Sequence, residues 1–383
     1  METVGIICEY NPLHKGHQKQ LAHVRATVGP DGGIVCLMSG NFVQRGSPAI
    51  VDKMRRAKAA VLCGADLVLE LPVVYALSSA EGFAFGGVGI LSGFCQKLCF
   101  GAETADAEQL MALAQALLSP AFFENLRSQL DKGLSFPATR QAVLQAMGID
   151  ASPLEQPNNI LAVEYCKAIL SQGCDLEPMV IHREGSYHAA QANDENPSAT
   201  AVRMQMLHGG SWQEYIPAQA AHCFLDAPLH AIAPAERAIL AKLRCMTDAE
   251  FEALPYGSEG LWRKLMHAAR SEATLDGILA AVKSKRYTRS RLDRMLMCAF
   301  LGITKRELET KAPYVRVLAF NDRGREILRQ ARLTGDFPNI GQSMEHPYQA
   351  LENRCSDLYG LFSLNGPEAP GAEEAYRVFY HKP

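Results

Sequence analysis

Short, continuous apolar runs that end at Gly, Asn or Pro are the feature that most limits how this chain can fold. Four lie in the first half of the sequence: VGIICEY (4–10), GIVCLMSG (33–40), ADLVLELP (65–72) and KLCFGAE (97–103). Each has the length of a strand, and an unbroken apolar run is typical of a strand buried on both faces of a parallel sheet. Helical patterns lie between them, so the alternation predicts an α/β fold with a doubly wound parallel sheet.

The rest of the chain changes in character after about residue 215. A further apolar run, EPMVIHRE (177–184), predicts a fifth strand, and residues 105–147 have helical patterns. Later segments are helical until the strand-like run YVRVLAF (314–320). We therefore predict an α/β domain over residues 1–215 and a mostly helical region over residues 216–383, with a small α/β element near 314–335. The Gly/Pro/Glu-rich tail after Phe362 is expected to be loosely held.

The composition of the 383 residues is that of a globular protein and limits the classes of partner. The net charge of −3 excludes a surface that is basic throughout, but it allows a local basic patch for nucleic acid. No apolar stretch reaches the ~20 residues of a membrane span, so no membrane association is expected. The eleven cysteines form no CxxC pair, which predicts reduced thiols, no metal site and a cytoplasmic protein.

The most informative segment is GIICEYNPLHKGHQKQL (5–21), in which an apolar run leads through an Asn-Pro turn into a helix. Unpaired backbone N–H groups and the positive end of the helix dipole make a helix N-terminus a natural phosphate site. Gly16 lets a phosphate approach the backbone, and His14 and His17 can both point at it. Exposed polar histidines beside a turn are the alternative, but the position at the first strand–helix junction favours phosphate binding.

A second segment, PSATAVR (197–203), places Ser198 and Thr200 ahead of Arg203. A hydroxyl-rich helix start can bind the outer phosphates of a nucleotide or cap the helix, and one geometry serves both purposes. Asp66 and Glu70 lie inside the third apolar run, where a structural role is expected for both carboxylates.

A basic segment, KSKRYTRSRLDR (283–294), lies in the helical region of this otherwise acidic chain. Its basic side chains predict a contact with the phosphate backbone of RNA, and Tyr287 lies among them as a stacking platform. A solvated helix face is the alternative interpretation. The residues expected to contact tRNA are Lys283, Lys285, Arg286, Arg289 and Arg291.

Several segments, in their order and spacing, resemble the bacterial tRNA(Met) cytidine acetate ligase family. They are GIICEYNPLHKGH, MSGNFVQRGSPAIVDKMRRAKAA, GADLVLELP, FGAE, PNNILAVEY and SATAVR. The HxGH pattern itself is similar to that of the wider nucleotidylyltransferase superfamily. The resemblance implies that residues 1–215 form a Rossmann-like catalytic domain that binds ATP, with Mg²⁺ held mainly by the nucleotide.

The resemblance also implies individual site residues. His14 and His17 match the catalytic positions, and Gly101, Asn158 and Arg183 match positions that hold ATP. Ser198, Thr200 and Arg203 match the superfamily's second phosphate motif. The ATP loop would comprise Ile7, Cys8, Glu9, Tyr10, Asn11, Pro12, Leu13, His14, Lys15, Gly16, His17, Gln18, Lys19 and Gln20.

The implied activity is that of a ligase with two half-reactions. ATP activates acetate to acetyl-adenylate, and the acetyl group then passes to N4 of the wobble cytidine of elongator tRNA(Met). Acetate and tRNA are the expected partners, and no protein partner is indicated. Two alternatives remain at this stage: a small-molecule nucleotidylyltransferase of cofactor biosynthesis, which leaves the helical region unexplained, and a non-catalytic RNA-binding protein, which leaves the HxGH motif unexplained.

Overall fold

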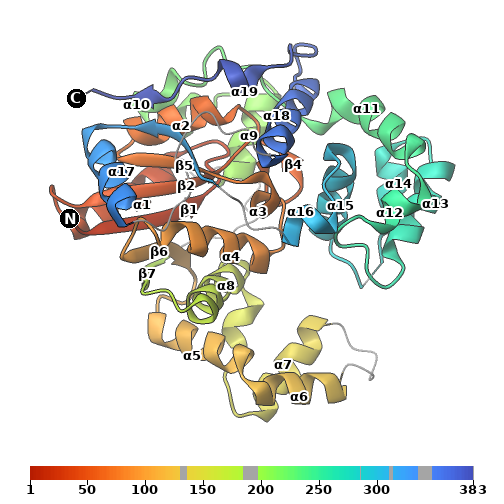
Figure 1. The fold of residues 1–383 in the computed structure, drawn as a ribbon, viewed down its shortest axis with the longest axis horizontal. Helices are drawn as coiled ribbons and strands as arrows, with labels where there is room; N and C mark the ends of the chain where they lie inside the picture. Colours follow the sequence, from red (N-terminus) through yellow and green to blue (C-terminus); the bar gives the residue numbers. More distant parts are fainter. Residues whose placement is uncertain (130–135, 184–196, 285, 310–313, 335–346, 383) are drawn as a thin grey trace.

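The computed structural model describes residues 1–129, 136–183, 197–284, 286–309, 314–334 and 347–382, and a seven-stranded sheet lies at its centre (Figure 1). The strand order is β7-β6-β1-β2-β5-β8-β9. The five strands from β7 to β5 are parallel to one another, whereas β8 runs antiparallel to β5. The bounds are β1 Thr3–Cys8, β2 Gly33–Ser39, β5 Leu67–Leu71, β6 Lys97–Ala102, β7 Glu177–His182, β8 Arg316–Phe320 and β9 Phe379–Tyr380.

The prediction of a mostly parallel α/β sheet is confirmed, and each of the predicted runs forms a strand. The central strand β1 is flanked by β2 on one side and by β6 on the other. The chain therefore leaves β1 toward β2 and later returns to its opposite side. In a doubly wound sheet this reversal opens a crevice at the carboxyl ends of the strands, where ligands bind. The loop after β1 is the one that contains the HKGH sequence.

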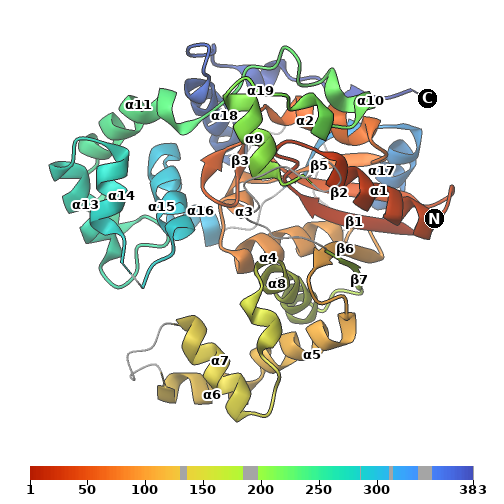
Figure 2. The same cartoon turned by 180° about the vertical axis from the view of Figure 1, so that it is seen from behind.

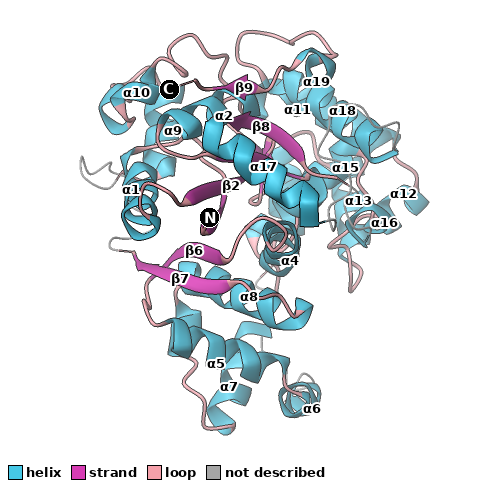
Figure 3. Ribbon diagram, turned by 60° about the vertical axis from the view of Figure 1, so that its left-hand side comes forward, coloured by secondary structure: helices cyan, strands magenta, loops and turns pink. Residues whose placement is uncertain are grey.

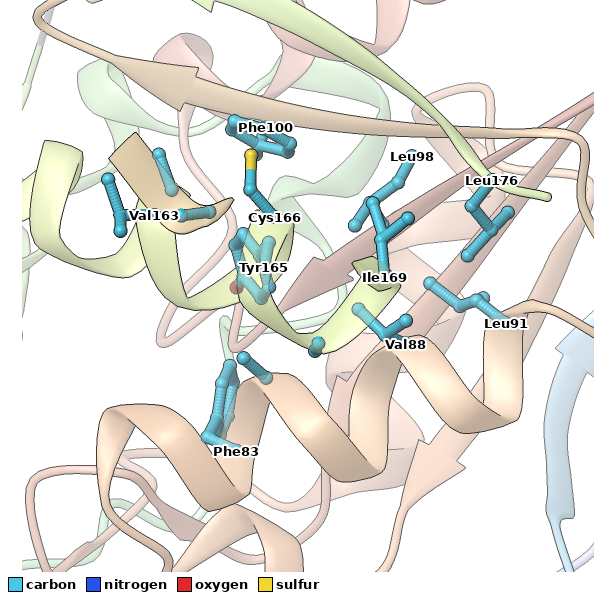
Figure 4. Packing of buried hydrophobic residues seen from close by; sticks show 14 of the residues in the cluster. Phe83, Val88, Leu91, Leu98, Phe100, Val163, Tyr165, Cys166, Ile169 and Leu176 are labelled. Atoms are coloured by element: carbon cyan, nitrogen blue, oxygen red, sulfur yellow. The ribbon is translucent and has the colours of Figure 1, made fainter. Parts of the chain in front are cut away.

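Helices cover both faces of the sheet (Figure 3). One face packs against the apolar sides of α1, α2, α9 and α10, and the other against α4, α5, α8 and α17. Figure 4 shows part of the second interface, where Phe83 and Val88 of α4 meet Tyr165 and Ile169 of α8. The bounds are α1 Lys15–Val28, α2 Lys53–Leu62, α3 Val73–Ala76, α4 Ala80–Leu91, α5 Ala107–Leu118, α8 Pro157–Gln172, α9 Ala199–Leu207, α10 Ala218–Ala221 and α17 Asp322–Thr334.

The predicted helical region is present, and its apolar core also includes Phe42 and, at α3, the residues Val73, Val74 and Leu77. Helices α11 to α16 lie at the end of the molecule opposite the N-terminus, whereas α17 lies near the N-terminus, and α6 and α7 project with α5 to one side (Figure 1). The bounds are α6 Pro120–Gln129, α7 Phe136–Ala146, α11 Ile232–Cys245, α12 Asp248–Glu252, α13 Leu261–Ser271, α14 Leu275–Val282, α15 Arg289–Leu301, α16 Lys305–Glu309, α18 Pro347–Tyr359 and α19 Ala372–Ala375. None of the described helices is both long and apolar enough to cross a membrane.

The last part of the chain returns to the first sheet. The predicted element near 314–335 forms β8 and α17, and β8 pairs with β5 although about 250 residues separate them. The prediction of a loosely held tail was wrong for the residues after Gly371. Glu373 of α19 is buried and accepts a hydrogen bond from Lys53 Nζ at 2.6 Å, and it also pairs with Arg316. This ion-paired carboxylate fixes the tail on the sheet.

Candidate active site

The loop between β1 and α1 brings two histidine rings together at the carboxyl edge of the sheet. His14 is the N-cap residue of α1 and His17 lies in its first turn. Their rings stack with centroids 3.7 Å apart and an interplanar angle of 23°. The His14 backbone N–H donates to His17 Nδ1 at 3.2 Å. Because Nδ1 accepts this bond, the proton of a neutral His17 lies on Nε2, which makes Nε2–H available as a donor.

Gly16 allows the His14 ring to lie against the first turn of α1. A Cβ atom at residue 16 would lie 3.0 Å from Cε1 and 3.1 Å from Nδ1 of that ring, so the ring would have to shift by a few tenths of an ångström. Within the described part of the chain, His14 Nδ1 is buried and has no hydrogen-bond partner. A buried polar atom without a partner is rare in a folded protein, and beside a helix N-terminus it is a candidate contact for a ligand group. An anionic oxygen beside the N-terminus of α1 would fit this donor set.

Both histidines are held in the neutral form. Burial, together with the nearby positive charges of Arg183 and Arg203, lowers the pKa of His14 to about 3. Burial also lowers the pKa of His17 well below its ordinary value, with His14 and Arg183 adding to the effect. At neutral pH the rings therefore act as hydrogen-bond donors of fixed orientation, and the positive charge of the site comes from the two arginines.

Arg56 of α2 holds this loop in place, and sequence reasoning did not identify it. The side chain is completely buried. Its Nη1 donates to the carbonyl oxygens of Glu9 at 2.6 Å and Ser39 at 3.1 Å, Nη2 donates to Gly40, and Nε donates to Val51 at 2.8 Å. One guanidinium thus joins the carboxyl ends of β1 and β2.

Two further hydrogen bonds fix the same loop. The Asn11 side chain accepts from the Ile50 backbone N–H at 2.8 Å, and the Glu9 carboxylate accepts from the Gln44 backbone N–H at 2.8 Å. The hairpin strands β3 (Phe42–Val43) and β4 (Ser47–Pro48), which flank Gln44, were not predicted from the sequence. These contacts mean that the shape of the loop depends on the chain that follows β2.

The side chains of the predicted ATP loop divide into two groups. Those of Cys8, Tyr10 and Leu13 are buried in the core beneath the loop, and the Tyr10 hydroxyl lies 3.4 Å from Cys36 Sγ. Burial raises the pKa of both the Cys8 thiol and the Tyr10 hydroxyl well above their ordinary values, so neither ionises near neutral pH. These buried side chains support the loop from beneath. The side chains that remain at least partly accessible are Ile7, Glu9, Lys15, His17, Gln18, Lys19 and Gln20.

The second predicted phosphate segment lies directly against the HKGH loop. Arg203 Nη1 donates to the Asn11 carbonyl oxygen at 2.6 Å, and Nη2 donates to Thr200 Oγ1 at 3.0 Å. Ser198 caps α9 by accepting from the Ala201 backbone N–H at 3.1 Å. Arg203 therefore joins α9 to the loop that leads into α1, and both helices lie on the face of the sheet that α2 also covers.

Gly101, Asn158 and Arg183 lie together on the other side of the loop. Arg183 follows β7, and its Nη1 donates to Asn158 Oδ1 at 3.1 Å. Gly101 of β6 lies next to the same arginine, and a Cβ there would be in ordinary van der Waals contact with it, 3.8 Å from Arg183 Cβ and Cδ. Glu103, which was not identified from the sequence, orients Asn158 by accepting from its Nδ2 at 2.6 Å. The structure thus brings these three predicted residues together beside the histidines.

The acidic pair inside the third run has the structural role that was predicted. Lys53 is buried and donates to both oxygens of Glu70, at 2.7 and 2.8 Å. The Asp66 carboxylate pairs with Arg25 and accepts from the Ile34 backbone N–H at 2.8 Å. Among the described residues no group of three or more His, Cys, Asp or Glu side chains could hold a metal ion. All eleven cysteines are free.

The basic segment 283–294 lies on α15 and the turn before it. Lys283, Arg286 and Arg289 are exposed, with Arg286 paired to Glu259 and Arg289 to Asp293. Arg291 is half-buried and donates to the Tyr256 carbonyl oxygen at 2.8 Å. Lys285 lies outside the described residues.

The prediction that Tyr287 is a stacking platform was wrong. Its ring is buried in the helical core, and its hydroxyl donates to Glu259 Oε2 at 3.3 Å. The basic segment also contacts the hairpin after β2. Arg294 Nη1 donates to the Gln44 carbonyl oxygen at 3.3 Å, and Gly46, with φ +79°, packs against the α15 backbone. The segment is therefore joined to the HKGH loop through Gln44 and Glu9.

Comparisons with a family model and with known proteins point to the same family. The family model of the HIGH nucleotidyl transferases matches residues 1–369. The tRNA(Met) cytidine acetate ligase of Clostridium novyi is 37% identical over 357 residues, which cover 88% of this chain and 89% of that protein. The enzyme of the same name from Alkaliphilus metalliredigens is 34% identical and covers 100% of this chain and 99% of its own.

Two solved structures have the same fold over their whole length. The crystal structure of Thermotoga maritima TmcAL in its apo form I has a TM-score of 0.92 and 29% identity, and the match covers 100% of both chains. The structure of Thermotoga maritima TmcAL bound with alpha-thio ATP has a TM-score of 0.89 and 29% identity with the same coverage. That protein therefore binds an ATP analogue on the same fold.

Proposed function

We propose, since this chain belongs to the tRNA(Met) cytidine acetate ligase family of the HIGH nucleotidyl transferases, that it uses ATP to attach acetate to the wobble cytidine of elongator tRNA(Met). The observation that carries the proposal is the pair of neutral, stacked histidines at the N-terminus of α1, flanked by two arginines at the reversal point of the sheet. This arrangement suits a nucleotide triphosphate that reacts at its α-phosphorus.

ATP would lie over the loop formed by residues 7–20. The α- and β-phosphates face His14, His17 and the first backbone N–H groups of α1, and the outer phosphates face Ser198, Thr200 and Arg203. Asn158, Arg183 and the backbone at Gly101 hold the nucleoside part. The buried, unpartnered His14 Nδ1 and the contact between Arg203 and the Asn11 carbonyl oxygen support this placement. Mg²⁺, when bound with ATP, neutralises phosphate charge, and we propose that phosphate oxygens hold it.

In the first half-reaction a carboxylate oxygen of acetate attacks the α-phosphorus in line with the departing pyrophosphate. A bond forms between acetate and AMP as the bond to the β-phosphate oxygen breaks. Negative charge grows on the non-bridging oxygens, where the His17 Nε2–H donor and the positive charge of Arg183 and Arg203 stabilise it. These donors are fixed before the reaction, because Arg56 and the α1 N-terminus hold the loop.

In the second half-reaction the exocyclic amine N4 of the wobble cytidine attacks the acetyl carbon and AMP leaves. A base in a single-stranded anticodon loop can turn out of its stack into a protein pocket, which suits this step. We propose that residues 216–383 hold the tRNA and that Lys283, Lys285, Arg286, Arg289 and Arg291 contact its backbone. The link from Arg294 through Gln44 to Glu9 supports a functional connection between that segment and the ATP loop. Because ATP and tRNA are cytoplasmic, we assign the protein to the cytoplasm.

Acetate-dependent exchange of label between pyrophosphate and ATP tests the first half-reaction. The wild-type protein should catalyse this exchange only when acetate is present. His17→Ala should lower it by at least ~100-fold, since a single preorganised donor contributes about that much. His23→Ala is the matched control, because His23 is exposed on the same helix. Exchange that requires a phosphopantetheine-like precursor in place of acetate would instead indicate a small-molecule nucleotidylyltransferase, and no exchange with either acceptor would indicate a non-catalytic protein.

A further inference from the structure

The exposed face of α13 carries a row of basic side chains that the proposed function has not used. The helix has the sequence LWRKLMHAARS and contains no acidic residue. Its apolar side packs into the core of the helical region, while Arg263, Lys264, His267 and Arg270 are exposed. The helical spacing of these four residues places them on one side of α13.

Two of these cations have no acidic partner in the described residues. Arg270 pairs with Asp248 at 2.6 Å, but no described carboxylate lies within ion-pairing distance of Arg263 or Lys264. The Arg263 guanidinium lies over the ring of Trp262, 4.7 Å from its centroid. A solvated basic face on a chain whose net charge is −3 concentrates positive potential at one place, which favours an anionic partner.

The turn that leads into α13 is bonded to the basic segment 283–294. The turn before α13 contains Tyr256 and Glu259, and three residues of the basic segment bond to it. Arg286 pairs with Glu259 at 3.0 Å, the Tyr287 hydroxyl donates to Glu259, and Arg291 donates to the Tyr256 carbonyl oxygen. The two basic elements therefore hold a fixed position relative to each other. In both Figure 1 and Figure 2, α13 lies beside α14 at the end of the molecule away from the N-terminus.

We propose that the exposed face of α13 is a second contact surface for the phosphate backbone of the tRNA, with Arg263 and Lys264 as its main contacts. The inference rests on the proposed function, because it takes tRNA as the partner. Phosphate is the group that matches unpaired guanidinium and ammonium groups on a solvated helix face. A contact of this kind carries no sequence information and sets the position of the RNA on the helical region.

Binding of tRNA by the full-length protein at a series of KCl concentrations tests the proposal. The variant is R263E together with K264E, and the matched control is R325E together with R329E on α17. These two arginines are exposed at the opposite end of the molecule, and the control changes the net charge by the same amount. We expect the α13 variant to bind tRNA about tenfold more weakly and to lower the slope of log affinity against log salt by about 2, because each phosphate contact contributes about 0.9. The control should bind like the wild type.

The proposal is overturned if the α13 variant binds tRNA with the affinity and the salt slope of the wild type. It is also overturned if the α13 variant and the control lose affinity for tRNA by the same amount. Unchanged circular dichroism shows that each variant is folded; if the charge reversal unfolds the protein, R263Q with K264Q replaces it and should lower the slope by the same amount. Acetate-dependent pyrophosphate exchange is measured on the wild type alone. Its absence would refute the proposed function, whereas a salt slope that depends on α13 would still establish the RNA surface.

Discussion

Replacement of Arg56 by Met should both destabilise the protein and impair adenylate formation. The arginine is buried and donates four hydrogen bonds to backbone carbonyl groups, three at the carboxyl ends of β1 and β2 and one at Val51 before α2. Methionine has a similar length but no donor. The substitution leaves four buried carbonyl groups without this partner, the Glu9 carbonyl at the start of the ATP loop among them.

The size of the effect follows from these contacts. Each hydrogen bond from a charged donor contributes about 1.5–3 kcal/mol, and the variant loses four of them. The variant, however, avoids the cost of burying a guanidinium on folding, which is several kcal/mol. A net loss of about 4 kcal/mol in the free energy of unfolding is therefore expected. For a chain of 383 residues this lowers the thermal midpoint by about 5 °C. A shift of about 1 Å in the loop should slow pyrophosphate exchange by about 100-fold.

Thermal unfolding and pyrophosphate exchange are measured on the same preparations. Arg55→Met is the matched control, because Arg55 is adjacent in α2 and its side chain is 40% exposed, and its ion pair with Asp52 is worth at most about 1 kcal/mol. If Arg56→Met unfolds at the same midpoint as Arg55→Met and retains its exchange rate, then Arg56 does not organise the loop and the reasoning is wrong.

Three further predictions concern other buried contacts. Burial, reinforced by Glu70, raises the pKa of Glu352 to about 7 from 4.5, so the folded state binds a proton more tightly than the unfolded chain and stability falls between about pH 4.5 and 7. Glu352→Gln should remove about 3 kcal/mol of that fall in the free energy of unfolding. Urea unfolding of the wild type and of Glu352→Gln measures it, and the same pH dependence in both would contradict the prediction. Arg203→Gln removes a cation beside the His14 ring, so it should raise the pKa of His14, as measured by NMR, and raise KM for ATP at least ~tenfold. An unchanged pKa of His14 would show that Arg203 does not act on this ring. Gly46→Ala places a Cβ 2.4 Å from the Arg294 backbone nitrogen and should destabilise the protein by about 2 kcal/mol or more; wild-type stability would refute the tight contact.

The parallel sheet and the HKGH site could be predicted from the sequence because their signals are local. A strand buried on both faces is an unbroken apolar run, and a helix that starts at a strand end contains its own anion site. Family resemblance added Gly101, Asn158 and Arg183, which no local pattern indicates. The structure brings Gly101 and Arg183 to one edge of the sheet because β6 lies between β1 and β7, and Asn158 joins them from α8 through its hydrogen bond with Arg183.

The residues that were missed are charged side chains with distant partners. Arg56 lies in the sequence KMRRAKAA, which looks like a solvated helix face, yet it is completely buried. Lys53 is neutralised by Glu70 and by Glu373, which is 320 residues away, and no sequence pattern links positions so far apart. The burial of Tyr287 was missed for the same reason, since its basic neighbours suggested exposure. Long-range pairing, rather than local propensity, decides these positions.

The most direct test of the central claim is transfer of radiolabelled acetate to tRNA(Met) transcripts. The wild-type protein, with ATP and Mg²⁺, should label a transcript with cytidine at the wobble position and should not label one with uridine there. Label should depend on ATP and should be absent with His17→Ala. Label in both transcripts, or none in either while acetate-dependent pyrophosphate exchange continues, would contradict the proposed acceptor.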